Sequence, residues 1–121
     1  MAERPTTESS RGEDAQQRGA LAMRSDRDGE THVIALSGEM DLSTVDLVEQ
    51  ELLRVEATDA ARIVLDLSEL EFLDSTGVRL IYMADVRSRQ DSDRLRIRRG
   101  PDKVQRLFVM TDLADRLPFV D

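Results

Sequence analysis

Hydrophobic residues in this chain alternate with polar ones in some stretches and recur every three or four positions in others, and these periods predict strands and helices. Between residues 20 and 36, two short apolar runs flank Asp28-Gly29, a dipeptide that favours a tight hairpin turn. We therefore expect two neighbouring antiparallel strands. An amphipathic pattern from Ser43 to about Ala57 then predicts a helix with Ser43 at its N-cap.

The second half of the chain continues with strands and helices in turn. Residues 62–67 form a nearly continuous apolar run, typical of a strand buried on both faces, and a helix is expected from Asp74 to Gln90. Residues 94–98 alternate like a strand with one wet face, and Gly100-Pro101 separates them from a last helix. This order predicts a single α/β domain: a mixed sheet of about four or five strands packed with three to four helices.

Composition sets the extent of the folded part. A chain of 121 residues is long enough for one core and too short for two. Residues 1–19 lack aromatic and branched apolar side chains and are rich in Ser, Thr, Glu, Gln, Arg and Gly. Such a segment cannot bury enough apolar surface to stay folded. We therefore predict a disordered tail over 1–19 and a folded domain over 20–121.

Charge and cysteine content exclude several classes of function. With 17 basic and 25 acidic residues, the net charge of −8 argues against a nucleic-acid partner. The absence of cysteine excludes a disulfide framework, a zinc–thiolate site and a thiol nucleophile. No apolar run is long enough to span a bilayer, and the N-terminal residues have no hydrophobic signal core. We expect a cytoplasmic protein with no membrane partner.

The junction at Asp74-Ser75-Thr76 carries the strongest chemical signal. An apolar strand precedes these residues and an apolar-periodic helix follows them, so they are expected to cap that helix. A hydroxyl in this place is exposed and fixed in direction. A helix start offers unpaired N–H groups and a positive dipole end, which suit a phosphate, either on a donor or as a covalent modification. The alternative is that these residues serve only as an N-cap.

Two other constellations suggest catalysis and are weaker. His32 is the only histidine and would have to complete any Ser–His–Asp hydrolase, but it lies within a strand pattern. Asp41, Asp66 and Asp74 lie at or near strand ends and could be pictured around Mg²⁺, as in a phospho-aspartate receiver. That interpretation fails because a receiver needs repeated strand–helix units and a lysine at a late strand end, whereas the only lysine, Lys103, follows Gly100-Pro101.

Three motifs in order resemble one family. These are Gly38-Glu39-Met40-Asp41, then Phe72-Leu73-Asp74-Ser75-Thr76-Gly77, then Gly100-Pro101 followed by Val104 and Leu107-Phe108. Together they resemble the STAS domain, and more narrowly the bacterial anti-sigma factor antagonists. The resemblance covers residues 20–121, and three motifs in register are more specific than any one alone.

The resemblance implies a switch rather than an enzyme. Antagonists of this family bind an anti-sigma factor that is also a serine kinase of the GHKL type, and so release a sigma factor. The kinase phosphorylates the serine after the motif's aspartate, here Ser75, with Thr76 as the runner-up, and a PP2C-type phosphatase removes the phosphate. No metal or cofactor is implied, and we expect a monomer or weak dimer. The expected partner-binding residues are Glu39, Asp41, Asp74, Ser75, Thr76, Gly77 and Arg79.

Two alternative functions stay open, the first of them within the same family. A STAS module can bind constitutively, as a scaffold in a sensory assembly or as the small subunit of a lipid-transport complex. An intact Asp74-Ser75-Thr76 makes that function less fitting without excluding it. A small metal-dependent phosphatase or receiver is the enzyme-class alternative.

This chain departs from the family pattern at two places. Val78-Arg79 replaces a common Leu-Gly, so a cation lies near the start of the helix, where it could pair with a partner carboxylate, pair with a phosphate on Ser75, or stay solvated. Thr111-Asp112-Leu113 replaces a common Thr-Gly-Leu, and Asp tolerates a left-handed backbone less well than Gly. If the strands before Asp41 and Ser75 run parallel, both residues should lie on one rim of the sheet.

Overall fold

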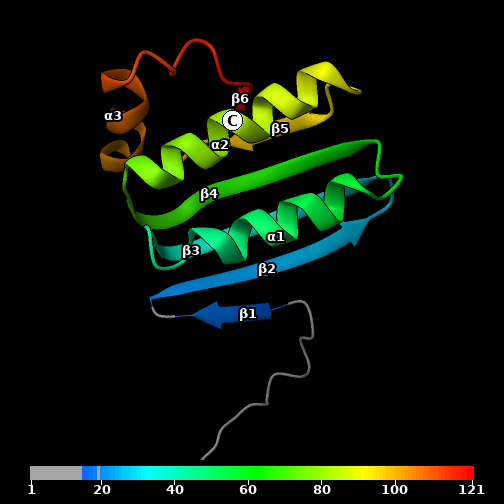
Figure 1. Cartoon of the computed structure of the whole chain (residues 1–121), viewed down its shortest axis with the longest axis horizontal. Helices are drawn as coiled ribbons and strands as arrows, with labels where there is room; N and C mark the ends of the chain where they lie inside the picture. Colours follow the sequence, from blue (N-terminus) through cyan, green and yellow to red (C-terminus); the bar gives the residue numbers. More distant parts are fainter. Residues whose placement is uncertain (1–14, 19) are drawn as a thin grey trace, which may run out of the picture.

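A computed structural model describes residues 15–18 and 20–121. These described residues form one mixed sheet of six strands, which lie side by side in sequence order, and three helices (Figure 1). The predicted α/β class with a mixed sheet is confirmed, and the short edge strands β1 and β6 add to the four strands that the pattern outlined. The strands are β1 Ala15–Arg18, β2 Leu21–Asp28, β3 Thr31–Met40, β4 Arg62–Leu73, β5 Leu95–Arg98 and β6 Phe119–Val120; the helices are α1 Val45–Glu56, α2 Ser75–Gln90 and α3 Asp102–Met110.

A tight hairpin joins β2 to β3. Asp28 pairs with Thr31 across the turn, so Gly29 and Glu30 alone form the connection. Gly29 has a φ of 66°, which glycine adopts without a Cβ penalty. The predicted antiparallel pair is therefore confirmed, although both strands are longer than the apolar runs that indicated them.

From β3 onward the sheet is parallel, and each crossover passes through a helix. β3 pairs with β4, β4 with β5 and β5 with β6, all in parallel. All three helices contribute buried side chains to the same core, so they cover one face of the sheet. Figure 1 shows α1 and α2 side by side over that face. The carboxyl ends of β3 and β4 consequently meet at one edge, where α1 and α2 begin.

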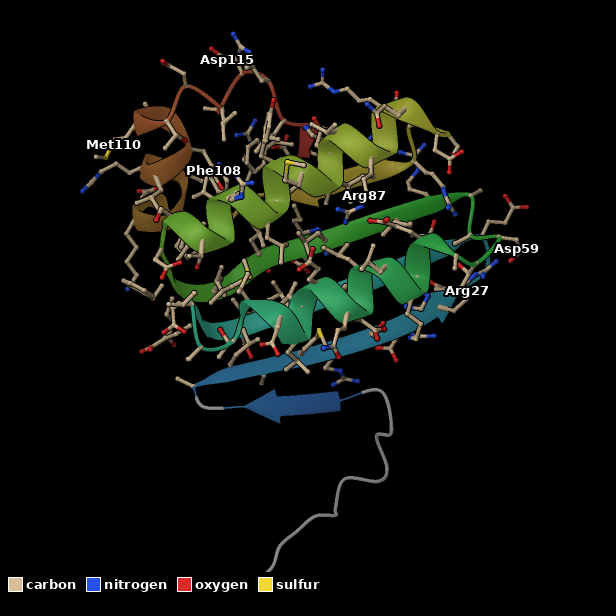
Figure 2. All side chains as sticks on the ribbon, in the orientation of Figure 1. Arg27, Asp59, Arg87, Phe108, Met110 and Asp115 are labelled. Carbon is tan, nitrogen blue, oxygen red and sulfur yellow. The ribbon has the colours of Figure 1, made fainter. Side chains whose placement is uncertain are left out.

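The core confirms the predicted amphipathic patterns. On the strands, alternate residues such as Ile34 and Leu36 are fully buried, while Val48, Leu52 and Val55 form the buried stripe of α1. From α3, Phe108 points into the core (Figure 2). Burying a large aliphatic side chain contributes about 1.5–3 kcal/mol, so these layers hold the helices in place on the sheet.

The segment predicted as a disordered tail is partly in the sheet. Ala15–Arg18 forms β1 and pairs antiparallel with β2, from Ala15 opposite Arg24 to Arg18 opposite Leu21. Composition alone could not indicate this, because strand addition satisfies backbone groups at the edge of β2 whatever the side chains are. The rest of that predicted tail, residues 1–14 and 19, lies outside the described residues.

Helix α3 ends in a Schellman motif with an aspartate at the left-handed position. The N–H of Leu113 donates to the carbonyl of Phe108 at 2.8 Å, and the N–H of Asp112 donates to that of Val109 at 3.1 Å. Asp112 has a φ of 62°. Glycine is preferred at this position because a Cβ makes the left-handed conformation unfavourable, which is the strain expected from the Thr111-Asp112-Leu113 sequence.

Replacing Asp112 by glycine should therefore stabilise the domain. We expect Asp112→Gly to raise the free energy of unfolding by about 0.5 kcal/mol, since relief of the left-handed strain outweighs the greater freedom of glycine in the unfolded chain. Urea denaturation would measure the change. Asp115→Gly, an exposed residue of the same segment with a negative φ, is the matched control and should be neutral or destabilising. Equal losses in both variants would contradict the assignment of strain to Asp112.

Candidate functional site

The loop after β3 and the start of α2 lie against each other. The N–H of Leu42 donates to Asp74 Oδ2 at 3.2 Å, and the N–H of Asp74 donates to the carbonyl of Met40 at 3.3 Å. Met40 is also paired with Leu73 across the parallel strands. The predicted adjacency of the Asp41 loop and the start of the second helix is thus confirmed. We call residues 41–44 together with residues 74–77 the Ser75 rim.

Asp74 is the N-cap of α2. Its backbone is extended, with φ −108° and ψ −175°, and Oδ1 accepts hydrogen bonds from the N–H of Thr76 at 3.0 Å and of Gly77 at 3.2 Å. Burial alone would raise the pKa of this carboxyl. The hydrogen bonds from the Thr76 hydroxyl and from the N–H groups of Gly77, Leu42 and Thr76 outweigh that effect and lower the pKa below its ordinary value. Asp74 is therefore ionised at neutral pH.

Ser75 and Thr76 differ in what their hydroxyls can do. The Thr76 hydroxyl donates a short hydrogen bond to Asp74 Oδ1, and Thr76 is only half-exposed. Ser75 is exposed at the first position of α2. Because the Thr76 proton is already used in the cap, the Ser75 hydroxyl is the one available for chemistry on this turn. The roles of both as phosphate acceptors stay predictions.

Gly77 allows α2 to start close to the sheet. A Cβ added here would lie 2.3 Å from Leu73 Cδ1 and 3.2 Å from Met40 Cε. Contacts this short require the neighbouring side chains to move, so a larger residue would push the first turn of α2 away from β3 and β4. The glycine of the motif thus helps to set the position of Ser75.

Asp41 organises the other half of the rim. Its Oδ1 accepts hydrogen bonds from the N–H of Ser43 at 2.9 Å and from the Ser43 hydroxyl at 2.7 Å. The prediction that Ser43 caps the first helix is wrong, because α1 begins at Val45 and Thr44 occupies the N-cap position. Ser43 is drawn instead into the turn that Asp41 forms with its own side chain, a local competitor of helix capping.

Thr44 is a residue of the rim that sequence reasoning missed. It is only 1% exposed, its Oγ1 accepts from the N–H of Asp41 at 3.0 Å, and its hydroxyl lies 3.2 Å from the carbonyl of Glu39. These bonds fix the loop between β3 and α1. A threonine directly before an amphipathic run was the available signal, but Ser43 beside it offered the same one.

The remaining predicted partner residues are on the surface. Glu39 is exposed near the end of β3, and Arg79 is exposed one helical turn after Ser75. Two apolar residues that were not among the predicted partner-binding residues are also exposed: Leu42 is 74% exposed and Phe72 is 48% exposed. The Ser75 rim and the residues next to it in the chain therefore combine acidic groups, one arginine and exposed apolar side chains, a composition suited to a protein partner.

Two hollows of the described residues lie away from the Ser75 rim. A cleft of about 450 Å³ lies between the C-terminal halves of α1 and α2, where Arg87 pairs with Glu56 at 2.9 Å. Figure 2 labels Arg87 on α2. A second, of about 520 Å³, lies between α2 and residues 115–117. Neither is lined by a residue of the Ser75 rim. An exposed site outside these clefts suits recognition by a macromolecule better than capture of a small substrate.

His32 belongs to a buried polar network rather than to a hydrolase site. Ser25 is 4% exposed, its Oγ lies 2.6 Å from His32 Nε2, and its hydroxyl donates a very short hydrogen bond to Glu51. Since the hydroxyl has one proton and gives it to Glu51, Nε2 must donate to Ser25 and cannot act as its base. Glu51 is held in addition by Arg54 at 2.6 Å. The structure thus places His32 and Ser25 in the packing between α1 and the sheet.

The same network should make stability depend on pH. Burial alone would raise the pKa of Glu51, but hydrogen bonds from Arg54 and Ser25 and the charges of Arg54 and His32 outweigh it, so the pKa lies below its ordinary 4.5. A depressed carboxyl pKa stabilises the fold above the unfolded-state pKa, and that stabilisation is lost as pH falls through the folded-state pKa.

We expect Glu51→Gln to lower the free energy of unfolding by about 1.5 kcal/mol at pH 7, because charge-assisted hydrogen bonds of a buried group are lost. The deficit should shrink as the pH falls below 4.5. Urea denaturation at several pH values would show it, with Glu49→Gln on the exposed side of α1 as control. A deficit that does not change with pH would contradict the role of the Glu51 charge.

The three aspartates considered for Mg²⁺ have other partners. Asp66 accepts from Arg98 at 2.7 Å on the sheet face away from the helices, while Asp41 and Asp74 hold the loop and the cap. Within the described ranges no cluster of three or more His, Asp or Glu side chains is arranged for a metal ion. None of the helices in residues 20–121 is long and apolar enough to cross a membrane.

The family model described as "Mlab, STAS domain" matches residues 23–120, and the chain belongs to the STAS domain family. Its relatives include the anti-sigma-B factor antagonists of Listeria monocytogenes and Listeria innocua. Each is 30% identical over 90 residues, which cover 74% of this chain and 79% of the relative.

Solved structures with the same fold include anti-sigma factor antagonists. One from Mycobacterium paratuberculosis superposes with a TM-score of 0.72 at 22% identity, covering 82% of this chain and 84% of the other. The Bacillus cell fate determinant SpoIIAA in its phosphorylated form gives 0.63 at 20% identity, covering 82% and 91%. These likenesses establish the fold and confirm the predicted STAS architecture.

Proposed function

We propose that this protein is a switchable anti-sigma factor antagonist that acts through the Ser75 rim. In the unmodified state the rim binds an anti-sigma factor that is also a GHKL-type serine kinase, and the bound sigma factor is released. The kinase then transfers the γ-phosphoryl group of ATP to Ser75 Oγ, with loss of the hydroxyl proton and release of ADP. The phosphorylated chain leaves its partner, and a PP2C-type phosphatase restores the serine. This function needs no catalytic group in the chain itself.

One observation carries this proposal. Ser75 is exposed and its backbone is held at the start of α2, while the hydroxyl beside it on Thr76 is bonded to Asp74. A kinase that reaches the rim therefore meets one available acceptor. The names of the Listeria relatives support an anti-sigma factor as the partner.

The proposed partner surface has apolar anchors beside the acceptor. The Leu42 N–H bonds to Asp74, so the Leu42 side chain is held next to the cap, and Phe72 lies two residues before Asp74. Exposed large apolar side chains are enriched among the residues that dominate binding energy when they become buried. We propose that these two side chains and Arg79 contact the kinase around Ser75.

Removing the Leu42 side chain should weaken partner binding without unfolding the domain. We expect Leu42→Ser to reduce affinity for the cognate kinase about tenfold, roughly 1.4 kcal/mol, because an apolar contact at the interface is lost. Stability should change by less than about 0.5 kcal/mol because the residue is 74% exposed. Calorimetric titration would measure the affinity. Leu53→Ser, at 47% exposure on the later turns of α1, is the control and should leave binding unchanged. Equal losses in both variants would argue against this surface.

The acceptor assignment can be tested with three chains. Incubation of the wild-type chain with the cognate kinase and ATP should add one phosphate, which mass spectrometry maps to Ser75. Ser75→Ala should abolish the modification, and Thr76→Ala should keep it, because Asp74 still caps α2 through the two N–H groups. Phosphate on Thr76 would preserve the switch and move its site. An unmodified wild-type chain in stable complex with the kinase would contradict the switch.

A non-switching STAS module is the second candidate. The description of the family model, "Mlab, STAS domain", favours it, because these words name the domain and not an anti-sigma factor antagonist. Such a module would bind its assembly with the same affinity in three forms: the wild-type chain, the Ser75→Ala variant and the chain phosphorylated on Ser75. The phosphorylation and binding measurements on one set of chains therefore separate the two functions.

A further inference from the structure

Arg79 and Ser75 occupy neighbouring places on one face of α2. They are four residues apart in the same helix, and both are exposed, whereas Val78 and Leu80 on either side of Arg79 are buried. Residues at this spacing have Cβ atoms about 5–6 Å apart, within reach of a guanidinium and a modified serine. Within residues 20–121 the Arg79 guanidinium has no acidic partner. A cation is therefore available one turn from the acceptor.

The helix start itself has little left to offer a phosphate. The N–H groups of Thr76 and Gly77 already donate to Asp74 at 3.0 and 3.2 Å, and the Leu42 N–H donates to the same carboxylate at 3.2 Å. Asp74 is ionised and directly precedes Ser75. A phosphate on Ser75 would thus find these three N–H groups already bonded to Asp74 and a negative neighbour beside it, so a cationic side chain within reach is its strongest available partner.

We propose that Arg79 binds the phosphate on Ser75 in the free chain and holds the phosphoserine on the first turns of α2. The inference rests on the proposed function, because it concerns the modified state of the same site. The order of the pair is the favourable one, since an acidic group four residues before a basic group stabilises a helix more than the reverse order. An arginine also matches a phosphate through two parallel N–H donors.

The pair explains how the modification can be tolerated by the fold. A phosphate adds a charge of about −1.5 to −2 at neutral pH. The positive dipole end of α2 favours that charge, whereas the ionised Asp74 beside it repels it. With Arg79 in place, the free domain keeps its helix. The phosphate then lowers the affinity for the partner rather than the stability of the domain. Val78-Arg79, which departs from the common family pattern, thereby acquires a role in regulation.

The titration of the phosphate itself provides a direct test. Phosphoserine is installed at position 75 of the full chain by genetic encoding, so no kinase is needed, and its second pKa is read by ³¹P NMR. We expect that pKa to be about 0.3 unit lower in the otherwise wild-type chain than in Arg79→Gln, because the dianion is stabilised by the nearby cation. The difference should largely disappear in 1 M NaCl.

Arg62→Gln serves as the matched control. Arg62 is exposed and begins β4, whereas Ser75 follows the other end of that strand. The second phosphate pKa in this variant should equal that of the chain with all arginines present. Equal values for Arg79→Gln and the chain with Arg79, or an equal shift in Arg62→Gln, would overturn the proposal. Because the phosphoserine is encoded, failure of a kinase to modify Ser75 would count against the proposed function and leave this result unaffected.

Discussion

Gly38→Ala should lower the free energy of unfolding by about 3 kcal/mol or more, one of the two largest effects that we expect. Gly38 lies in β3 with a φ of 89°, and a Cβ here would lie 1.9 Å from the carbonyl oxygen of Ala20. The left-handed strain contributes about 1–2 kcal/mol. The remaining loss of stability arises because the Ala20 carbonyl belongs to the backbone and cannot move aside as a flexible side chain can. The chain at the start of β2 must therefore shift, and the hydrogen bond from the Glu39 N–H to the Ala20 carbonyl is lost.

Gly29→Ala separates the two contributions. Gly29 also has a positive φ, 66°, but a Cβ there meets nothing within 4 Å. Its loss of stability in urea denaturation should therefore be the strain alone, about 1 kcal/mol. If both variants lose the same amount, the close approach of β2 and β3 at Gly38 is not what requires glycine.

Local patterns predicted the parts of this molecule that local forces determine. Asp28-Gly29 predicted the hairpin because a two-residue turn needs a residue that accepts a positive φ. Asp74 predicted the start of α2 because one side chain satisfies the free N–H groups of a helix. The sequence also predicted that the Asp41 loop and the start of α2 lie together if β3 and β4 run parallel, which they do.

Non-local pairing decided what the sequence could not predict. β4 runs to Leu73 rather than ending at Leu67, because its polar-looking continuation pairs with the end of β3, up to Leu73 opposite Met40. The short strands β1 and β6 form by addition to existing edges, which needs few sequence preferences.

The site was predictable in its chemistry and less so in its surroundings. Asp74 and Ser75 were indicated by their order in the chain, since capping acts within one helical turn. Gly77 was indicated only by the resemblance to the family motif, because its contacts include Met40 on another strand. The exposure of Leu42 and the burial of Thr44 depend on how the loop after β3 lies against α2. That arrangement arises only when the two parallel strands end together.

Phosphorylation of Ser75 should reduce affinity for the partner kinase by at least about a hundredfold, the second large effect. The phosphate adds a charge of about −1.5 to −2 beside Asp74, whose lowered pKa keeps it ionised. A partner that buries this turn must remove both anions from water without a matched counter-charge of its own. A hundredfold loss corresponds to about 2.7 kcal/mol, within the range for one uncompensated charge at an interface.

Two variants bracket the expected effect. Ser75→Ala should bind the kinase nearly as well as the wild type, because Asp74 still caps α2 and the exposed hydroxyl makes no intramolecular bond among the described residues. Ser75→Asp should bind more weakly than the wild type but better than the phosphorylated chain, since it brings one charge on a shorter side chain.

The affinity of the fully Ser75-phosphorylated chain for its cognate anti-sigma kinase tests the central claim most directly. Calorimetric titration of phosphorylated and unmodified chains against the same kinase, at one salt concentration, gives the ratio of the two dissociation constants. We predict a ratio of about 100 or more, with native far-ultraviolet circular dichroism for both chains. Equal, tight binding by the two chains would contradict the switch.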